Sequence, residues 1–247
     1  MINSFLHALK FLTIFPIPEP KRQDLKSLGR STTFFPLVGL LLGLILVAFN
    51  FLLSYFLPHR VVNFLLVISL IILTRGIHLD GLADSADGFL VGGQKDEILK
   101  IMRDTRIGTF GITALFLILL LKFLLLDSLP NEIKNFALIT MPSLGRWSTV
   151  YAAFLYPAAR GDGLGKIFID NTKSFELFVA SSISLLIGIL CFKCGSIHVF
   201  AGLLLFTTAI AHFMSKRISG MTGDTLGAIT ELSEVWILLT ILVSFSH

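Results

Sequence analysis

Residues 61–79 read VVNFLLVISLIILTRGIHL, an apolar run long enough to cross the hydrocarbon core of a bilayer as a helix. Further apolar runs occupy residues 33–57, 107–126, 135–156, 174–192, 197–214 and 230–246. No run alternates with the period of a barrel strand, so each is expected to be helical. The sequence therefore predicts an all-α, polytopic membrane bundle of about seven transmembrane helices.

Composition leads to the same fold class. Of the 247 residues, 54% are hydrophobic and 15% are charged, whereas soluble domains carry about 25% charged residues. Because apolar runs recur from one end to the other, residues 1–247 are expected to form a single integral membrane domain. Residues 2–15 are amphipathic and are followed by Pro16, which is typical of an interfacial or short re-entrant helix at the N-terminus.

The net charge of +4 is concentrated in the connections between apolar runs. If residues 19–32 are cytoplasmic, the connections near 80–106, 157–173 and 215–229 lie on the same side, and they hold most of the lysines and arginines. The positive-inside rule then assigns this side to the cytoplasm. Because no basic patch exists apart from these loops, we expect a lipid bilayer and not nucleic acid as the partner.

An acidic block follows the opening run directly, HLDGLADSADG at residues 78–88. Its three acids, Asp80, Asp84 and Asp87, stand at i, i+4 and i+7 and share one face of a helix. They repel each other, and a divalent cation would offset that repulsion. Oxygen ligands suit Mg²⁺, which commonly recruits substrate phosphates as further ligands. The block predicts a Mg²⁺ enzyme that acts on a phosphate or diphosphate, with His78 as a supporting residue.

A second block, RDTRIGTFG, covers residues 103–111 at the start of another apolar run. Arg103 and Arg106 flank Asp104, and the planar guanidinium group suits phosphate oxygens. We interpret the arginines as substrate-binding residues and Asp104 as a candidate that completes the metal shell. Ordinary positive flanking of a membrane helix is the alternative interpretation, but it does not explain Asp104 or the glycines.

Two weaker signals lie toward the C-terminal half. The segment TGDTLGAITE, residues 222–231, offers Asp224 at a turn and Glu231 at the edge of the last apolar run, as candidates for metal, hydroxyl or base recognition. Arg146 interrupts an apolar run, where an ionisable group is functional or paired, and we expect it to bind an anion. Lys122 is expected to be snorkelling or paired.

Together these blocks resemble the cobalamin synthase family, the adenosylcobinamide-GDP ribazoletransferases. The resemblance rests on four matching stretches and on the chain length: FPLVG at 35–39, HLDGLADSADG at 78–88, RDTRIGTFG at 103–111 and GDTLGA at 223–228. It therefore covers essentially the whole chain. Ser85 stands where threonine is usual for the family, which is a conservative change.

The resemblance implies a Mg²⁺-dependent transferase of late cobalamin (vitamin B12) biosynthesis in the bacterial cytoplasmic (inner) membrane. Adenosylcobinamide-GDP and α-ribazole, or its 5′-phosphate, would give adenosylcobalamin, or its 5′-phosphate, and GMP. The resemblance carries over four acids as catalytic and metal residues: Asp80, Asp84, Asp87 and Asp104. Substrate binding by a second set is a physical inference: Arg103, Arg106, Arg146 and Asp224. A homo-oligomer, or association with other late cobalamin enzymes, is compatible with this interpretation.

Two alternatives remain open from the sequence. A CDP-alcohol phosphotransferase of phospholipid synthesis also clusters aspartates on membrane helices, but its hallmark is Asp-x-x-Asp-Gly-x-x-Ala-Arg. Here the order is Asp-x-x-x-Asp-x-x-Asp-Gly, and no Ala-Arg follows. A divalent-cation transporter would hold its acids near the membrane midplane, whereas this acidic block lies at a predicted membrane edge.

Overall fold

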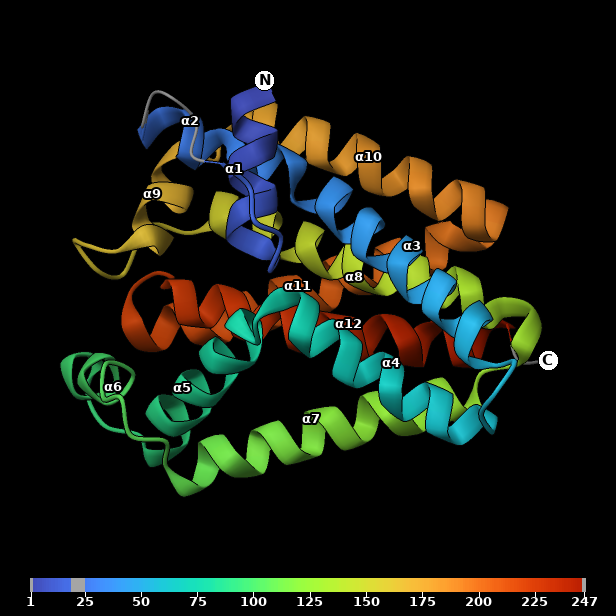
Figure 1. Ribbon diagram of the computed structural model, residues 1–247. Helices are drawn as coiled ribbons and strands as arrows, with labels where there is room; N and C mark the ends of the chain where they lie inside the picture. Colours follow the sequence, from blue (N-terminus) through green and yellow to red (C-terminus); the bar gives the residue numbers. More distant parts are fainter. Residues whose placement is uncertain (1, 19–24, 246–247) are drawn as a thin grey trace.

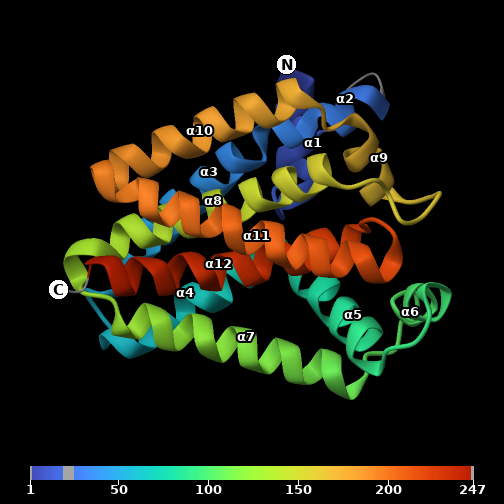
Figure 2. The same ribbon diagram turned by 180° about the vertical axis from the view of Figure 1, so that it is seen from behind.

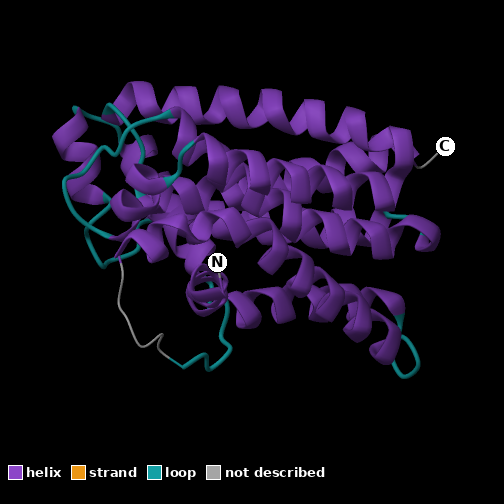
Figure 3. Ribbon diagram, turned by 90° about the horizontal axis from the view of Figure 1, so that it is seen from above, coloured by secondary structure: helices purple, strands orange, loops and turns teal. Residues whose placement is uncertain are grey.

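The computed structural model describes residues 2–18 and 25–245, and its regular elements are all helices (Figures 1 and 3). The predicted all-α fold class is therefore confirmed for the described part of the chain. The elements are α1 (Ile2–Leu12), α2 (Leu25–Gly29), η1 (Arg30–Phe34), α3 (Phe35–Leu53), α4 (His59–Thr74), α5 (Ile77–Val91), α6 (Lys95–Ile101), α7 (Thr109–Ser128), α8 (Asn131–Leu155), α9 (Leu164–Asn171), α10 (Ser174–Phe192), η2 (Lys193–Gly195), α11 (Ser196–Ile218) and α12 (Gly223–Phe245).

The long helices run back and forth between two ends of the molecule (Figures 1 and 2). Helix α8 packs against α3 on one side and against α12 on the other, and α12 in turn contacts α5 and α7. The short helices α2, α6 and α9 gather at one end, with the α11–α12 turn, while the C-terminus lies at the opposite end (Figure 1). The basic connections thus share one end, as the charge pattern predicts.

Within residues 2–18 and 25–245, four segments are long and apolar enough to cross a membrane: Lys26–Leu53, Thr109–Ser128, Ser174–Ile218 and Gly223–Phe245. The bent pair α4 and α5 would make a fifth if it counts as one span. Each predicted apolar run other than 61–79 lies largely on a single long helix, and the multi-pass membrane character is supported. The predicted number of about seven spans is not confirmed.

The opening run does not form one continuous helix. Helix α4 ends at Thr74, and Arg75 and Gly76 both adopt left-handed backbone angles, with φ of 56° and 65°. Helix α5 begins at Ile77 and is bent by 91° from α4. The expectation of an uninterrupted segment over 61–79 is therefore wrong, because two successive left-handed residues cannot continue a right-handed helix. The acids consequently lie on a separate helix that leads to the basic end.

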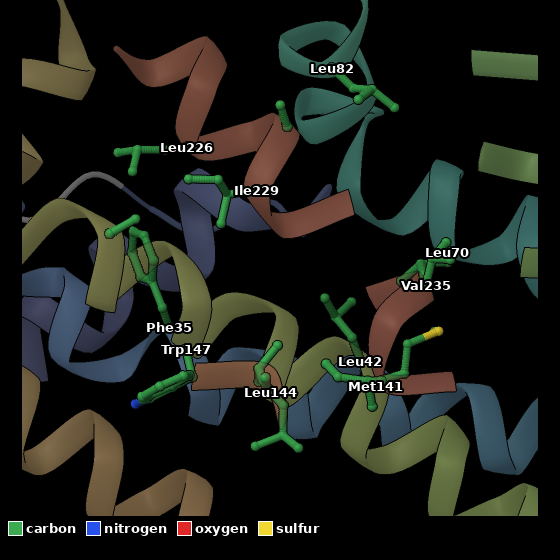
Figure 4. Close-up of a cluster of buried hydrophobic side chains, with 14 of the residues drawn as sticks. Phe35, Leu42, Leu70, Leu82, Met141, Leu144, Trp147, Leu226, Ile229 and Val235 are labelled. Atoms are coloured by element: carbon green, nitrogen blue, oxygen red, sulfur yellow. The ribbon is translucent and has the colours of Figure 1, made fainter. Parts of the chain in front are cut away.

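The packing of α3 on α8 uses the small residues of the FPLVG region. A Cβ atom added at Gly43 would lie 2.6 Å from the Cα atom of Ile139, so the two backbones are in close contact. Gly39 and Gly43, four residues apart, thus form a helix-packing face on α3. Around this crossing lies the buried core, in which Leu42 approaches Met141 (Figure 4).

Candidate active site

A cavity of about 310 Å³ lies at the basic end of the bundle. It is enclosed by the first turns of α5 and α12, the end of α8, helix α9 and the end of α1. Its charged lining residues are Asp80, Arg160, Asp162, Lys166 and Asp224. Another part of the cavity lining is apolar and includes Phe11, Phe35, Phe168, Met221 and Leu226. The cavity thus joins a charged surface to an aromatic one.

Two glycines bring α5 and α12 together beside this cavity. A Cβ atom at Gly81 would lie 2.7 Å from the carbonyl oxygen of Asp224, and one at Gly227 would lie 3.2 Å from the carbonyl oxygen of His78. The backbones therefore touch at this crossing. As a result, Asp80 on α5 and Asp224 on α12 line the same cavity, although they are far apart in sequence.

The predicted acidic face does not point into one environment. Asp80 is exposed to the cavity, Asp84 is half-buried and Asp87 is buried. Asp84 experiences the negative charges of Asp80, Asp224 and Asp87 and the positive charge of Arg160. Asp84 is therefore repelled both by the acids of its own helix and by Asp224 of α12, and of these acids Asp80 and Asp224 line the cavity.

Asp87 is held by the backbone of the second predicted block. The N–H groups of Gly108 and Gly111 donate to its two carboxylate oxygens, at 2.7 and 2.9 Å. These glycines lie at the start of α7. A carboxylate there accepts hydrogen bonds from the free N–H groups and is attracted by the positive end of the helix dipole. A Cβ atom at Gly111 would lie 2.5 Å from Asp87 Oδ2, which explains the glycine there. Asp87 therefore locks α5 onto α7.

The remaining charges of that block lie outside the cavity lining. Arg106 donates through Nε and Nη2 to the two oxygens of Asp104, at 3.0 and 2.7 Å. These hydrogen bonds from Arg106 lower the pKa of the Asp104 carboxyl to about 2. Arg103 donates to Asp162 at 2.6 Å, and Asp162 does line the cavity. The structure thus brings Arg103 to the rim, and it leaves Asp104 and Arg106 paired with each other.

Arg146 and Lys122 belong to a buried network in the middle of the bundle. The Lys122 Nζ atom lies 2.6 Å from Glu231 and 2.5 Å from Glu234, and Arg146 Nη1 lies 3.2 Å from Glu234. The prediction that Lys122 is paired is confirmed. The anion that Arg146 contacts is Glu234 of the same chain, and the sequence analysis did not single out Glu234.

Arg160 is a cavity residue that the sequence analysis treated only as one of the loop charges. Its Nη1 donates to Asp224 Oδ2 at 2.9 Å and its Nη2 donates to the Leu99 carbonyl oxygen at 3.2 Å. Two backbone hydrogen bonds fix its loop, from Ala159 N–H to the Met221 carbonyl and from Met221 N–H to the Pro157 carbonyl, both 2.8 Å. No local motif marks Arg160, because its partners come from distant parts of the chain.

The donor set at the cavity suits a hard cation in chemistry. Asp80 and Asp224 line the cavity, and Asp84 lies close enough to experience their negative charges. These three carboxylates supply oxygen ligands only, which is the preference of Mg²⁺. Over residues 2–18 and 25–245, however, no group of three or more His, Cys, Asp or Glu side chains is arranged to hold a metal ion. A cation at this place would therefore need oxygen ligands beyond the side chains as they stand, and Mg²⁺ takes such ligands from water and from substrate phosphates.

Comparison with known proteins gives a consistent result over the whole chain. The family model for cobalamin-5-phosphate synthase matches residues 4–242. A protein of Geotalea daltonii named adenosylcobinamide-GDP ribazoletransferase is 38% identical over 241 residues, which cover 98% of this chain and 97% of the relative. Proteins of the same name from Fusobacterium nucleatum and Herpetosiphon aurantiacus are 38% and 36% identical, covering 98% and 100% of this chain and 98% and 99% of those relatives. No solved structure gives a significant match.

Proposed function

The chain belongs to the cobalamin-5-phosphate synthase family, and we propose that it joins adenosylcobinamide-GDP to α-ribazole, or to α-ribazole 5′-phosphate, with release of GMP. It is accordingly a transferase of late cobalamin biosynthesis. The observation that carries the proposal is the cavity at which Asp80 and Asp224 meet Arg160 beside an aromatic wall. Family membership decides against the CDP-alcohol phosphotransferase and cation-transporter alternatives.

The size of the cavity supports a division of the two substrates. A volume of about 310 Å³ is at the lower end of the range for small-molecule sites. It is sufficient for the nucleoside α-ribazole, whereas a corrin ring with its attached nucleotide is far larger. The rings of Phe11 and Phe168 lie 4.7 Å apart at the apolar wall, which suits a heteroaromatic base. We assign α-ribazole to the cavity and the corrinoid to its mouth.

The reaction is a phosphoryl transfer that needs positioning and charge neutralisation more than covalent help. A ribose hydroxyl oxygen of α-ribazole forms a bond to the phosphorus on the cobinamide side of the diphosphate. The bond from that phosphorus to the bridging oxygen breaks, and GMP leaves. A carboxylate at the cavity is proposed to accept the hydroxyl proton, and not Asp87 or Asp104, because the oxygens of these two are already engaged by N–H donors.

Mg²⁺ dependence is part of the proposal. We propose that Asp80, Asp84 and Asp224 hold Mg²⁺ together with oxygens of the substrate diphosphate. When bound, the ion would neutralise the charge that develops on the departing phosphate. The mutual repulsion of these three acids, two of which line the cavity, supports this assignment. Asp87 would act by fixing α5 on α7. Arg103, which donates to Asp162 at the rim of the cavity, would bind phosphate oxygens of the substrate.

The orientation in the membrane follows from the charges. The short helices α2, α6 and α9 mark the basic end of the bundle (Figure 1), and residues of α9 and of the α11–α12 turn at this end line the cavity. The positive-inside rule assigns such an end to the cytoplasm. We propose that the cavity opens on the cytoplasmic side of the bacterial inner membrane. Soluble nucleotides and Mg²⁺ are available there.

The proposal is tested with purified full-length protein, adenosylcobinamide-GDP, α-ribazole and Mg²⁺, with and without EDTA. We expect GMP and a cobalamin product in equal amounts, and no product after chelation. Product formation that persists in EDTA would remove the Mg²⁺ part of the proposal. Release of no GMP from this corrinoid substrate would remove the reaction itself.

A further inference from the structure

We propose that Arg160 is an exchangeable counter-ion: it holds Asp224 while no cation is bound, and it moves to the substrate diphosphate when Asp224 turns to the metal. The inference rests on the proposed function and deepens it, because it adds a residue and a binding order to the same site. Its basis is the contact between Arg160 Nη1 and Asp224 Oδ2, at 2.9 Å, in the wall of the cavity.

The hydrogen bonding of Arg160 in this position is incomplete. Nη1 and Nη2 have partners, but Nε is buried and has no hydrogen-bond partner among the described residues. A buried donor without an acceptor is unfavourable, so the guanidinium gains by finding a better partner. Phosphate oxygens are such a partner, because the planar fork of arginine binds them in pairs. The present position is therefore one that substrate can displace.

Asp224 cannot serve Arg160 and a divalent cation equally well. Its Oδ2 atom accepts hydrogen bonds from Arg160 and, at 3.4 Å, from the Thr222 hydroxyl. The positive charge of Arg160 also acts on Asp84, so it reduces the repulsion between the acids. A cation placed between these acids would take over that role and repel the guanidinium. Arg160 and the cation thus compete for the same negative charge.

The freed guanidinium remains at the cavity. Its loop is fastened to the α11–α12 turn by the backbone pairs around Ala159 and Met221, so only the side chain has to move. Lys166, also in the cavity lining, stands on α9 and is paired with Asp170 at 2.5 Å. An arginine beside the acids can therefore neutralise diphosphate oxygens at the moment the cation arrives. Metal and diphosphate are then expected to bind cooperatively, since the metal frees Arg160 for the diphosphate and the diphosphate frees Asp224 for the metal.

The test measures two affinities that must change in opposite directions. Binding of Mn²⁺ alone is followed by the paramagnetic resonance signal of the free ion, and binding of radiolabelled GDP in saturating Mg²⁺ is followed by equilibrium dialysis. In Arg160→Gln, Mn²⁺ alone is expected to bind about fivefold more tightly, because its competitor is gone. GDP is expected to bind about fivefold more weakly, because its arginine is gone. A protein that is merely misfolded would lose both.

Two further variants separate the effect of charge from that of the guanidinium group and from a non-specific loss of charge. Arg160→Lys retains the positive charge but not the fork, so Mn²⁺ binding should stay within twofold of wild type while GDP binding falls at least threefold. The control Arg60→Gln removes an arginine paired with Asp127 at 3.3 Å at the far end of the bundle, and it should change neither affinity.

Each outcome decides something. Unchanged Mn²⁺ affinity in Arg160→Gln, or unchanged GDP affinity in both Arg160 variants, overturns the exchange, and the proposed function stands if wild type still releases GMP in a Mg²⁺-dependent reaction. Failure of wild-type protein to bind Mn²⁺ overturns the exchange as well. If that protein also releases no GMP, the proposed function fails with it.

Discussion

Gly81→Ala is the substitution that separates the acids with the smallest chemical change. The added Cβ atom would lie 2.7 Å from the Asp224 carbonyl oxygen and 2.9 Å from its Cα atom. Ordinary contacts begin at 3.4 Å, so the shorter distance falls 0.7 Å below that limit. Both atoms belong to the backbone of α12 and cannot rotate away. Helices α5 and α12 must therefore move apart, and the distances from Asp80 and Asp84 to Asp224 increase by a comparable amount.

This displacement has two expected magnitudes. Overpacking at a close crossing costs about 1–3 kcal/mol of folding free energy. A misplacement of about 1 Å in a catalytic arrangement lowers the rate by about 10²-fold, so 0.7 Å should lower GMP release by about one to two orders of magnitude. The loss of activity is thus expected to exceed what the loss of folded protein explains.

The assay compares GMP release with thermal unfolding in the same preparation. Gly161→Ala is the matched control, because a Cβ atom there meets nothing within 4 Å, although the residue lies in the loop that carries Arg160. We expect the control to retain wild-type activity. If Gly81→Ala retains activity within twofold of wild type, the inference that this crossing sets the acid geometry is refuted.

Three further changes probe other contacts. Asp84→Asn should reduce GMP release at least about 10²-fold without loss of expression, as for removal of a preorganised charge, and appreciable turnover would contradict its assignment to the metal site. Asp87→Asn places an amide against two N–H donors at 2.7 and 2.9 Å, so the unfolding free energy should fall by about 1–3 kcal/mol, whereas an unchanged melting temperature would argue against the cap. Glu234→Gln leaves two buried cations sharing one carboxylate and should cost about 3–5 kcal/mol, with partial recovery when Lys122→Met is added. Additive losses in the double variant would show that the pair is not coupled.

The helices and the acidic block could be predicted because their signals are local. Apolar runs reveal membrane helices through composition alone, and each run other than 61–79 lies largely on a single long helix. Close-packed glycines were also recognisable at Gly39 and Gly43, since small residues four apart form one helix face. The bend after Thr74 was missed, because Gly76 is one glycine in an apolar run and the left-handed angle of Arg75 has no marker in the sequence.

The set of residues that line the cavity could not be predicted from local signals in the same way. Helical spacing correctly placed Asp80, Asp84 and Asp87 on one helix, but it does not tell which neighbour each carboxylate meets. Asp87 accepts hydrogen bonds at the start of α7, whereas Asp80 lines the cavity with Asp224 beside the crossing at Gly81 and Gly227. Arg160 lines the cavity only because its loop pairs with the α11–α12 turn, which is a contact between distant segments of the chain. Such contacts are properties of the assembled bundle.

Helix α12 links the buried network to the cavity. Asp224, Gly227, Glu231 and Glu234 follow one another at spacings of three, four and three residues, so they form one stripe along the helix. The first two residues of the stripe meet α5 and the cavity, while the last two bind Lys122 on α7 and Arg146 on α8, about 10–15 Å further along. Rotation of α12 would unpair buried charges, which is strongly unfavourable. The ion pairs in the interior therefore set the direction in which Asp224 faces, and their cost in desolvation is offset by a fixed geometry at the cavity.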